Sequence, residues 1–159
     1  MRPYGPSYQT RSVVMGRHGM VASSHPWATQ CGLDVLRQGG NAVDAAIAVN
    51  AMLGLVEPMS CGIGGDLFAL VWDDRTKRIH GLNASGRSPG RASADALRAK
   101  GSTISTYGSD SWTVPGCVRG WQTLLEKFGS RPLDALLRPA IATAREGFPV
   151  TEVIAGYWK

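Results

Sequence analysis

The longest apolar run in the chain lies between Ala42 and Val56, where Asp44 and Asn50 are the only strongly polar side chains. A helix over these residues has no polar face to turn toward water, so the pattern predicts a core helix that is buried on all sides. Asn41, directly before the run, is a residue type that commonly caps a helix N-terminus. At about fifteen residues the run is shorter than the roughly twenty that span a bilayer, and we expect no membrane partner.

A second helix is predicted immediately before this one. Pro26 suits its first turn, and the Gly39-Gly40 pair suits its C-terminal end. Because only a few residues join the two helices, we expect them to be antiparallel neighbours. The predicted apolar side consists of Trp27, Ala28, Cys31, Val35 and Leu36.

Strands are predicted on either side of the chain's centre. The continuous apolar run Leu67–Trp72 is typical of a strand that is covered on both faces. Asp73–Lys77 predicts a turn, after which Arg78–Leu82 pairs back as a hairpin. Two shorter strands are predicted at Met20–Ser23 and Trp112–Val114.

The second half of the chain predicts further helices. After Pro115-Gly116, apolar residues recur at helical spacing as far as Phe128, and Gly129 predicts the end of that helix. Its inward positions are Trp121, either Cys117 or Val118, and either Leu124 or Leu125. Short helices are also predicted over Ala94–Lys100, Leu133–Leu137 and Pro139–Glu146, and from Thr151 onward.

Composition and charge limit the size of the domain and the kinds of partner that we expect. The chain has 159 residues, 43% of them hydrophobic, which is enough for one domain of ordinary size with a core. Its net charge of +5 comes from 17 basic and 12 acidic residues. The basic residues are scattered, whereas a nucleic-acid-binding protein concentrates them on one face or arm and interleaves aromatic residues. We therefore expect no nucleic-acid partner.

The chain has three cysteines, Cys31, Cys61 and Cys117, which cannot all pair within one chain. No two of them have the spacing of a metal site, so we expect no metal ion, and nothing in the sequence indicates a cofactor. Cys31 and Cys117 fall on apolar helix faces, where a free cysteine behaves as a small hydrophobic residue.

The residues themselves offer no complete catalytic group. Cleavage of an amide needs a nucleophile, a base and an oxyanion site. Ser60-Cys61 beside the glycine-rich segment offers a nucleophile but has no convincing His partner, so a structural role for Cys61 is favoured. His25 and His80 are expected to be surface or satisfied residues. A buried carboxylate is costly unless it is hydrogen-bonded, and for Asp44 we expect a helix-capping or core polar contact.

Several strings of residues occur in an order that is informative as a whole. They are Gly19–Pro26, Gln38–Ala46, Val56-Glu57-Pro58, Gly62–Gly65, Val114-Pro115-Gly116, Phe128-Gly129, Leu137, Pro139–Ala142 and Ala144–Val150. On these strings the chain resembles the N-terminal region of the large subunit of gamma-glutamyltransferases (gamma-glutamyl transpeptidases). Ordered agreement across about 130 positions is far more specific than any short motif.

The resemblance implies part of an N-terminal-nucleophile hydrolase fold, an α/β (or α+β) layered sandwich with two sheets between helix layers. In that family a precursor cuts itself, and the freed Thr of the small subunit attacks the gamma-glutamyl amide with its own amine as base. This Thr lies beyond the matched region, so we expect no catalytic residue here. Residues 1–18 are expected to be a loose lead-in, and residues 19–159 the N-terminal portion of the large-subunit domain.

One substrate contact of the family falls within the matched region, an Arg four positions before a Pro that grips the alpha-carboxylate of the glutamyl group. Relative to Pro89, that position holds Ser85. Arg87, two positions later, is the substrate-binding candidate, since a planar guanidinium suits carboxylates. The alternative for Arg87 is a surface loop residue or a structural ion pair. The Leu82–Pro89 string is more similar to the family branch of amidohydrolases and acylases of other small acids.

Three functions therefore stay open. The first is part of a gamma-glutamyltransferase-like enzyme, whose partners would be the rest of the large subunit, the small subunit with its Thr, and a small gamma-glutamyl amide. The second is part of a related enzyme for another acid amide, such as an oxamate-like or acyl-lactam compound. The third is a non-catalytic chain that binds a partner. Residues 1–17 lack the apolar core of a secretory signal, so we expect a cytoplasmic location, although relatives are often periplasmic or secreted.

Overall fold

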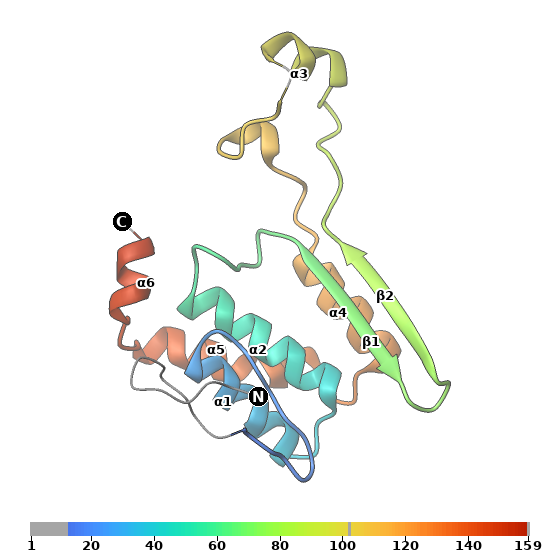
Figure 1. Ribbon diagram of the computed structural model, residues 1–159, viewed down its shortest axis with the longest axis vertical. Coiled ribbons are helices and arrows are strands. Elements are labelled where there is room, and N and C mark those ends of the chain that lie inside the picture. Colours follow the sequence, from blue (N-terminus) through green and yellow to red (C-terminus); the bar gives the residue numbers. More distant parts are fainter. Residues whose placement is uncertain (1–12, 102, 159) are drawn as a thin grey trace.

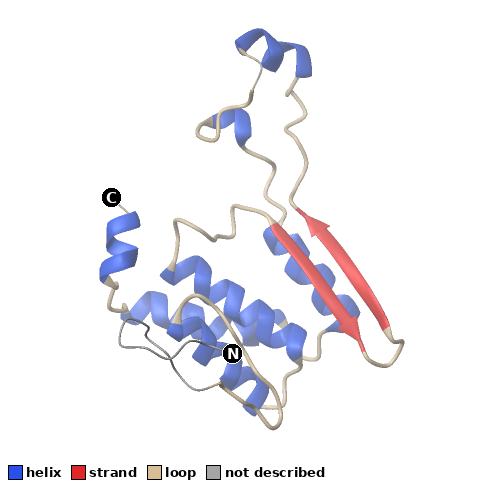
Figure 2. Cartoon of the chain, viewed as in Figure 1, coloured by secondary structure: helices blue, strands red, loops and turns tan. Residues whose placement is uncertain are grey.

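The computed structural model describes residues 13–101 and 103–158. Helices α1, α2, α4 and α5 form the body, and a β-hairpin lies along one side of it (Figures 1 and 2). An arm that carries α3, formed by residues 88–101 and 103–113, projects away from the body (Figure 1). The elements, in order, are α1 (Pro26–Arg37), α2 (Ala42–Val56), β1 (Leu67–Asp73), β2 (Arg78–Ala84), α3 (Ala94–Lys100), the 3-10 helix η1 (Ser109–Ser111), α4 (Cys117–Phe128), α5 (Leu133–Glu146) and α6 (Glu152–Tyr157).

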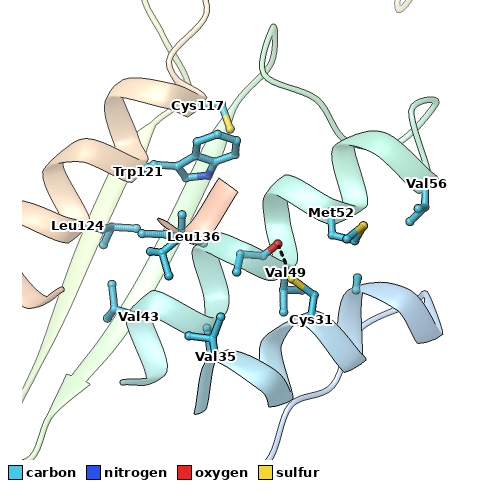
Figure 3. Close-up of a cluster of buried hydrophobic side chains, with 14 residues drawn as sticks. Cys31, Val35, Val43, Val49, Met52, Val56, Cys117, Trp121, Leu124 and Leu136 are labelled. Carbon is cyan, nitrogen blue, oxygen red and sulfur yellow. Dashed lines mark hydrogen bonds between the residues drawn. The ribbon is translucent and has the colours of Figure 1, made fainter. Parts of the chain in front are cut away.

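Helices α1 and α2 are antiparallel neighbours, as predicted. Ser24, just before α1, donates a hydrogen bond to Glu57 at the end of α2, with 2.7 Å between Oγ and Oε2. Further along α1, the Cys31 thiol lies 3.7 Å from the Ala48 carbonyl oxygen, the dashed line in Figure 3. Because later residues of α1 meet earlier residues of α2, the two helices run in opposite directions. Gly39 has φ +83°, a left-handed conformation that glycine adopts readily where a helix ends.

The predicted core helix is confirmed over Ala42–Val56. The prediction that it is buried on all sides is wrong within the described residues, because Ala42 and Ala46 are exposed. Helices α1, α4 and α5 cover the remaining faces, whereas this stripe of small residues lines an open hollow. None of the described helices is both long and apolar enough to cross a membrane.

Helix α4 closes the core against α2. Cys117, Trp121 and Leu124 are buried, whereas Val118 is exposed and Leu125 is half-buried, which settles the two alternatives left by the sequence. Asn50, the second polar residue of α2, accepts a hydrogen bond from the indole Nε1 of Trp121 at 2.8 Å. The Trp121 ring lies beside the Cys117 side chain (Figure 3). The polar residue inside the apolar run is therefore satisfied by the donor that the facing helix provides.

Asp44 joins α2 to the turn between α4 and α5, which confirms the predicted helix-capping contact. One carboxylate oxygen accepts the Asn41 N–H at 2.8 Å, and the Asn41 side chain accepts the N–H groups of Val43 and Asp44. The other oxygen accepts the Ser130 N–H at 2.9 Å and the Arg131 N–H at 3.2 Å, and the Ser130 hydroxyl also donates to the carboxylate. The side chain is 0% exposed, so every charge-stabilising contact comes from protein donors.

The hairpin of β1 and β2 is confirmed, with Leu67 opposite Ala84 and Asp73 opposite Arg78. One face of the hairpin packs on α4, where a Cβ atom at Gly120 would lie 2.9 Å from side-chain atoms of Leu67 and Ala84. The other face is open, so the prediction that both faces are covered is wrong within the described residues. Its apolar side chains are 56–83% exposed: Phe68, Leu70, Trp72 and Ile79.

Three local predictions are also wrong. Met20–Ser23 forms no strand, and Val114 makes only an isolated bridge with Arg87. A strand needs hydrogen-bonded neighbours along its length, and the described residues give Met20–Ser23 none and Trp112–Val114 only this one bridge. The two short helices predicted around Pro139 are one continuous helix, α5. Proline forfeits one backbone hydrogen bond inside a helix, but burial of Leu136 on α2 holds the two halves in line.

The predicted lead-in, residues 1–18, is described only in its last third. Residues 13–18 are exposed and form neither helix nor strand. Residues 1–12 of the lead-in lie outside the described residues.

We expect replacement of Asp44 by Ala to lower the free energy of unfolding by about 3 kcal/mol, because it removes a helix cap and leaves buried N–H groups unpaired. Burial alone would raise the pKa of Asp44, but hydrogen bonds from Ser130, Asn41 and Arg131 outweigh it and hold that pKa below its ordinary value of 3.8. The contribution is therefore full above the ordinary pKa and is lost as the pH falls through the lowered one.

Urea unfolding followed by tryptophan fluorescence, at neutral pH and in acid, measures both effects. The matched control is Asp34→Ala, which removes an exposed ion pair with Arg37 and should cost less than about 0.5 kcal/mol. Equal losses for the two variants at neutral pH would contradict the role given to Asp44.

We expect the purified chain to self-associate, because the open face of the hairpin is a contiguous apolar surface. Leu70, at 83% exposed, lies on this face, so Leu70→Lys should shift sedimentation toward monomer. Ala142→Lys adds the same charge on the exposed side of α5 and should leave association unchanged. A compact monomer with cooperative unfolding for the unaltered chain would refute the expectation.

Candidate functional site

The first candidate site is a cavity beside the glycine loop, which we define as Gly62–Gly65. Its volume is about 900 Å³, and its walls come from α2, the glycine loop, the arm and the start of α4. The Gly65 carbonyl oxygen accepts the N–H groups of Gly116 at 3.2 Å and Cys117 at 3.0 Å. The glycine loop therefore fixes where α4 begins. The cavity is lined by Asn50, Pro58–Gly62, Gly64–Asp66, Thr106, Ser111–Thr113 and Cys117.

Two thiols line this glycine-loop cavity, and neither is an activated nucleophile. Burial and the charge of Glu57 raise the pKa of Cys61, while burial and the charges of Cys61 and Asp66 raise that of Cys117. A thiol with a raised pKa is mostly protonated at neutral pH, and only its small thiolate fraction is nucleophilic. Among the described residues, no cysteine, serine or threonine side chain is hydrogen-bonded to a histidine side chain. This arrangement agrees with the structural role favoured for Cys61.

The two histidines considered from the sequence lie apart from this cavity. His25 is buried, and its Nδ1 accepts the Trp27 N–H at 3.2 Å, so it is a satisfied helix cap as expected. The His80 ring packs on Phe128 with 5.1 Å between ring centroids. Its Nε2 is buried and has no hydrogen-bond partner among the described residues, so the expectation is wrong for His80.

The second candidate site is a hollow of about 650 Å³ that contains Arg87, where β2 leads into the arm and the arm returns to α4. The Arg87 carbonyl oxygen accepts the Val114 N–H at 2.8 Å, and the Ser85 carbonyl oxygen accepts the Thr113 hydroxyl at 2.9 Å. Gly86, with φ +87°, allows this close crossing, because a Cβ atom there would lie 1.9 Å from the Val114 carbonyl oxygen.

The Arg87 side chain is exposed and forms no ion pair with any described residue. Arg119 from the first turns of α4 lines the same hollow. Sequence reasoning missed Arg119, since only the tertiary fold brings it to Arg87. Two guanidinium groups without carboxylate partners among the described residues make this Arg87 hollow suitable for an anion.

The described residues contain no group of three His, Cys, Asp or Glu side chains that could hold a metal ion. Ser85, which stands where the resemblance implies an Arg, donates from its hydroxyl only to the neighbouring Gly86 carbonyl oxygen, at 3.4 Å. Ser85 lines the Arg87 hollow too, but the positive charge of the hollow comes from Arg87 and Arg119.

Comparison with family models matches residues 28–159 to the gamma-glutamyltranspeptidase model. The chain belongs to the gamma-glutamyltranspeptidase family. The glutathione hydrolase proenzyme of Bacillus subtilis (strain 168) is 40% identical to this family member over 151 residues, which is 91% of this chain and 26% of that proenzyme. The chain thus spans about a quarter of the length of that relative.

Solved structures place the same family member in the N-terminal-nucleophile hydrolase fold, of which it forms a partial α+β piece. Cephalosporin acylase from Bacillus halodurans is 48% identical with a TM-score of 0.88, and the match covers 98% of this chain and 29% of the acylase. The gamma-glutamyltranspeptidase of Helicobacter pylori is 31% identical with a TM-score of 0.83, over 91% of this chain and 42% of that chain. The fold class implied by the resemblance is confirmed.

We expect Gly86→Ala to open the base of the arm, because the added methyl group would collide with the Val114 carbonyl oxygen at a backbone conformation that only glycine adopts readily. The Val114 N–H should then exchange with deuterium at least about tenfold faster, since its hydrogen bond to Arg87 is lost. Gly90→Ala is the matched control, because nothing lies within 4 Å of a Cβ atom there. Protection of Val114 that survives Gly86→Ala would contradict this account.

Proposed function

We propose that this chain supplies the N-terminal part of an amidohydrolase of the gamma-glutamyltranspeptidase family. The observation that carries the proposal is the 48% identity to cephalosporin acylase over 98% of the chain. In the reaction proposed, a Thr from polypeptide outside this chain attacks the amide carbonyl of an acid amide. The described residues, which lack a nucleophile paired with a base, provide scaffold and a substrate contact.

The partners proposed are the rest of the large subunit and a small subunit that carries the Thr. The open face of the hairpin supports a further layer of polypeptide, since Phe68, Leu70 and Trp72 are exposed in a strand that is apolar from Leu67 to Trp72. The exposed alanine stripe of α2 supports the same inference from a second surface. Both surfaces are apolar, so a complementary apolar layer of polypeptide is enough to cover them.

The substrate proposed is a small amide that carries a carboxylate, with Arg87 as its anchor. Arg87 and Arg119 line one hollow, and neither guanidinium is neutralised by a described carboxylate. An Arg fork binds a carboxylate through two parallel hydrogen bonds, which fixes the orientation of the acid as well as its position. This is the chemistry that a gamma-glutamyl group and other amide-bearing acids share.

A second candidate function keeps the amidohydrolase reaction but differs in the acyl group of the substrate. Ser85 occupies the position where the resemblance to gamma-glutamyltransferases implies an Arg, and the identity to the acylase, 48%, exceeds the 31% to the Helicobacter pylori gamma-glutamyltranspeptidase. These two observations favour an acyl group other than gamma-glutamyl. Parallel assays of the complete protein with a gamma-glutamyl anilide and with amides of other small acids, oxamate among them, distinguish the two candidates.

We expect Arg87→Ala in the complete protein to raise the KM at least about tenfold, because a charged hydrogen bond is worth about 1.5–3 kcal/mol. The kcat should change little, since the bond that breaks lies at the other end of the acyl group. Arg75→Ala, in the turn at the far end of the hairpin, removes the same charge and serves as the control.

An unchanged KM would retire Arg87 as the anchor while leaving the amidohydrolase proposal standing. The proposal itself would fail if the complete protein hydrolysed none of these amides. It would also fail if the 159-residue chain alone hydrolysed one of them.

A further inference from the structure

We propose that Cys61 and Cys117 form a thiol pair that a peroxide oxidises to an intramolecular disulfide, which links the glycine loop to the first residue of α4. The pair is distant in sequence but lines one cavity, the glycine-loop cavity. No proposed catalytic or substrate-binding residue takes part, so the inference is independent of the proposed function.

Contacts with α2 bring the two cysteines close together. The Cys117 sulfur lies 3.6 Å from Oδ1 of Asn50, while a Cβ atom at Gly54 would lie 3.4 Å from the α-carbon of Gly62. Asn50 and Gly54 are one helical turn apart on the same side of α2, a separation of about 5–6 Å between side chains. Cys61 directly precedes Gly62, so the fold places the residues Cys61 and Cys117 beside neighbouring turns of one helix.

Backbone hydrogen bonds hold the second side of this arrangement. The Gly65 carbonyl oxygen accepts the Cys117 N–H, and the Gly65 N–H donates to the Gly62 carbonyl oxygen at 3.2 Å. A disulfide needs α-carbons about 4.4–6.8 Å apart. The glycine loop can supply the last adjustment, because a Cβ atom added at Gly62 or Gly64 would meet nothing within 4 Å, so both residues have room to move.

The reaction balances with a peroxide as the oxidant. Cys61 is half-buried and more accessible than Cys117, so peroxide can reach the small fraction of Cys61 that is thiolate. That thiolate attacks one peroxide oxygen, the O–O bond breaks, and Cys61 becomes a sulfenic acid as one water leaves. The Cys117 sulfur then attacks the Cys61 sulfur and displaces the hydroxyl group as a second water. Two sulfur atoms are oxidised and both peroxide oxygens are reduced.

Cys31 is the internal control. It is buried between α1 and α2, and its thiol faces the Ala48 carbonyl oxygen. Burial, assisted by the charge of Asp34, raises the pKa of Cys31 to about 11. With little thiolate and no access, Cys31 should stay reduced while the pair reacts.

The test treats the reduced chain with hydrogen peroxide at low protein concentration, then unfolds it, alkylates the remaining thiols and digests it with trypsin. Cleavage after Arg37, Arg75, Lys100 and Arg119 leaves each cysteine on a different peptide. We expect a linked peptide that joins residues 38–75 to residues 101–119, with Cys31 as the one alkylated cysteine. Before alkylation, the intact oxidised chain should have a mass about 2 Da below that of the reduced chain. Dithiothreitol should separate the peptides.

Two cysteine variants test which thiols form the disulfide. Cys117→Ser should leave Cys61 as a sulfenic acid that a dimedone probe labels, whereas Cys31→Ser should leave the linked peptide unchanged. The proposal is overturned if the unaltered chain keeps three thiols, if Cys61 forms only intermolecular links on non-reducing gels, or if Cys61 is over-oxidised without a link to Cys117. Peptide mapping of the unaltered chain decides the matter even if a variant does not fold.

Discussion

The carboxylate of Asp44 is the contact on which the arrangement of the helices depends. It caps α2 from within its first turn and at the same time binds the backbone of Ser130 and Arg131, 86 and 87 residues away. Arg131 also donates to the Gln38 carbonyl oxygen at the end of α1. The Asp44 carboxylate therefore fixes where α2 begins and where α4 turns into α5, and Arg131 ties that turn to the end of α1. A buried charge with this many donors is costly to leave unpaired, which makes the geometry specific as well as stable.

Local patterns predicted the helices well because their signals lie within a few residues. Pro26, the Gly39-Gly40 pair and Asn41 mark helix ends that the structure confirms. The prediction of two short helices in place of α5 was wrong for a related reason. Pro139 is a local stop signal, and the packing of α5 on α2, with Leu136 buried, overrides it. Which of Cys117 and Val118 faces inward could not be read from spacing, because both fit one helical face to within a residue.

Surfaces and site contacts were harder to predict, since they depend on residues far apart in the chain. The apolar run Leu67–Trp72 correctly predicted a strand, but not that Phe68, Leu70 and Trp72 stand open in the described structure. Arg87 was found through its place before Pro89, whereas Arg119 joins it only because Val114 pairs with Arg87 and brings α4 back to the hairpin. The nearness of Cys61 to Cys117 likewise depends on their shared contacts with α2.

The crossing of Arg87 and Val114 has a consequence for how the chain tolerates change in length. The described residues between Arg87 and Val114 form an arm that leaves the body and returns to it beside the same bridge, and α3 within this arm buries no residue. The entropy cost of closing such an excursion grows only logarithmically, by about 0.6 kcal/mol for each doubling of its length. Insertions and deletions in this segment therefore cost the helical core little, so the arm can change in length while the helices beneath it stay the same.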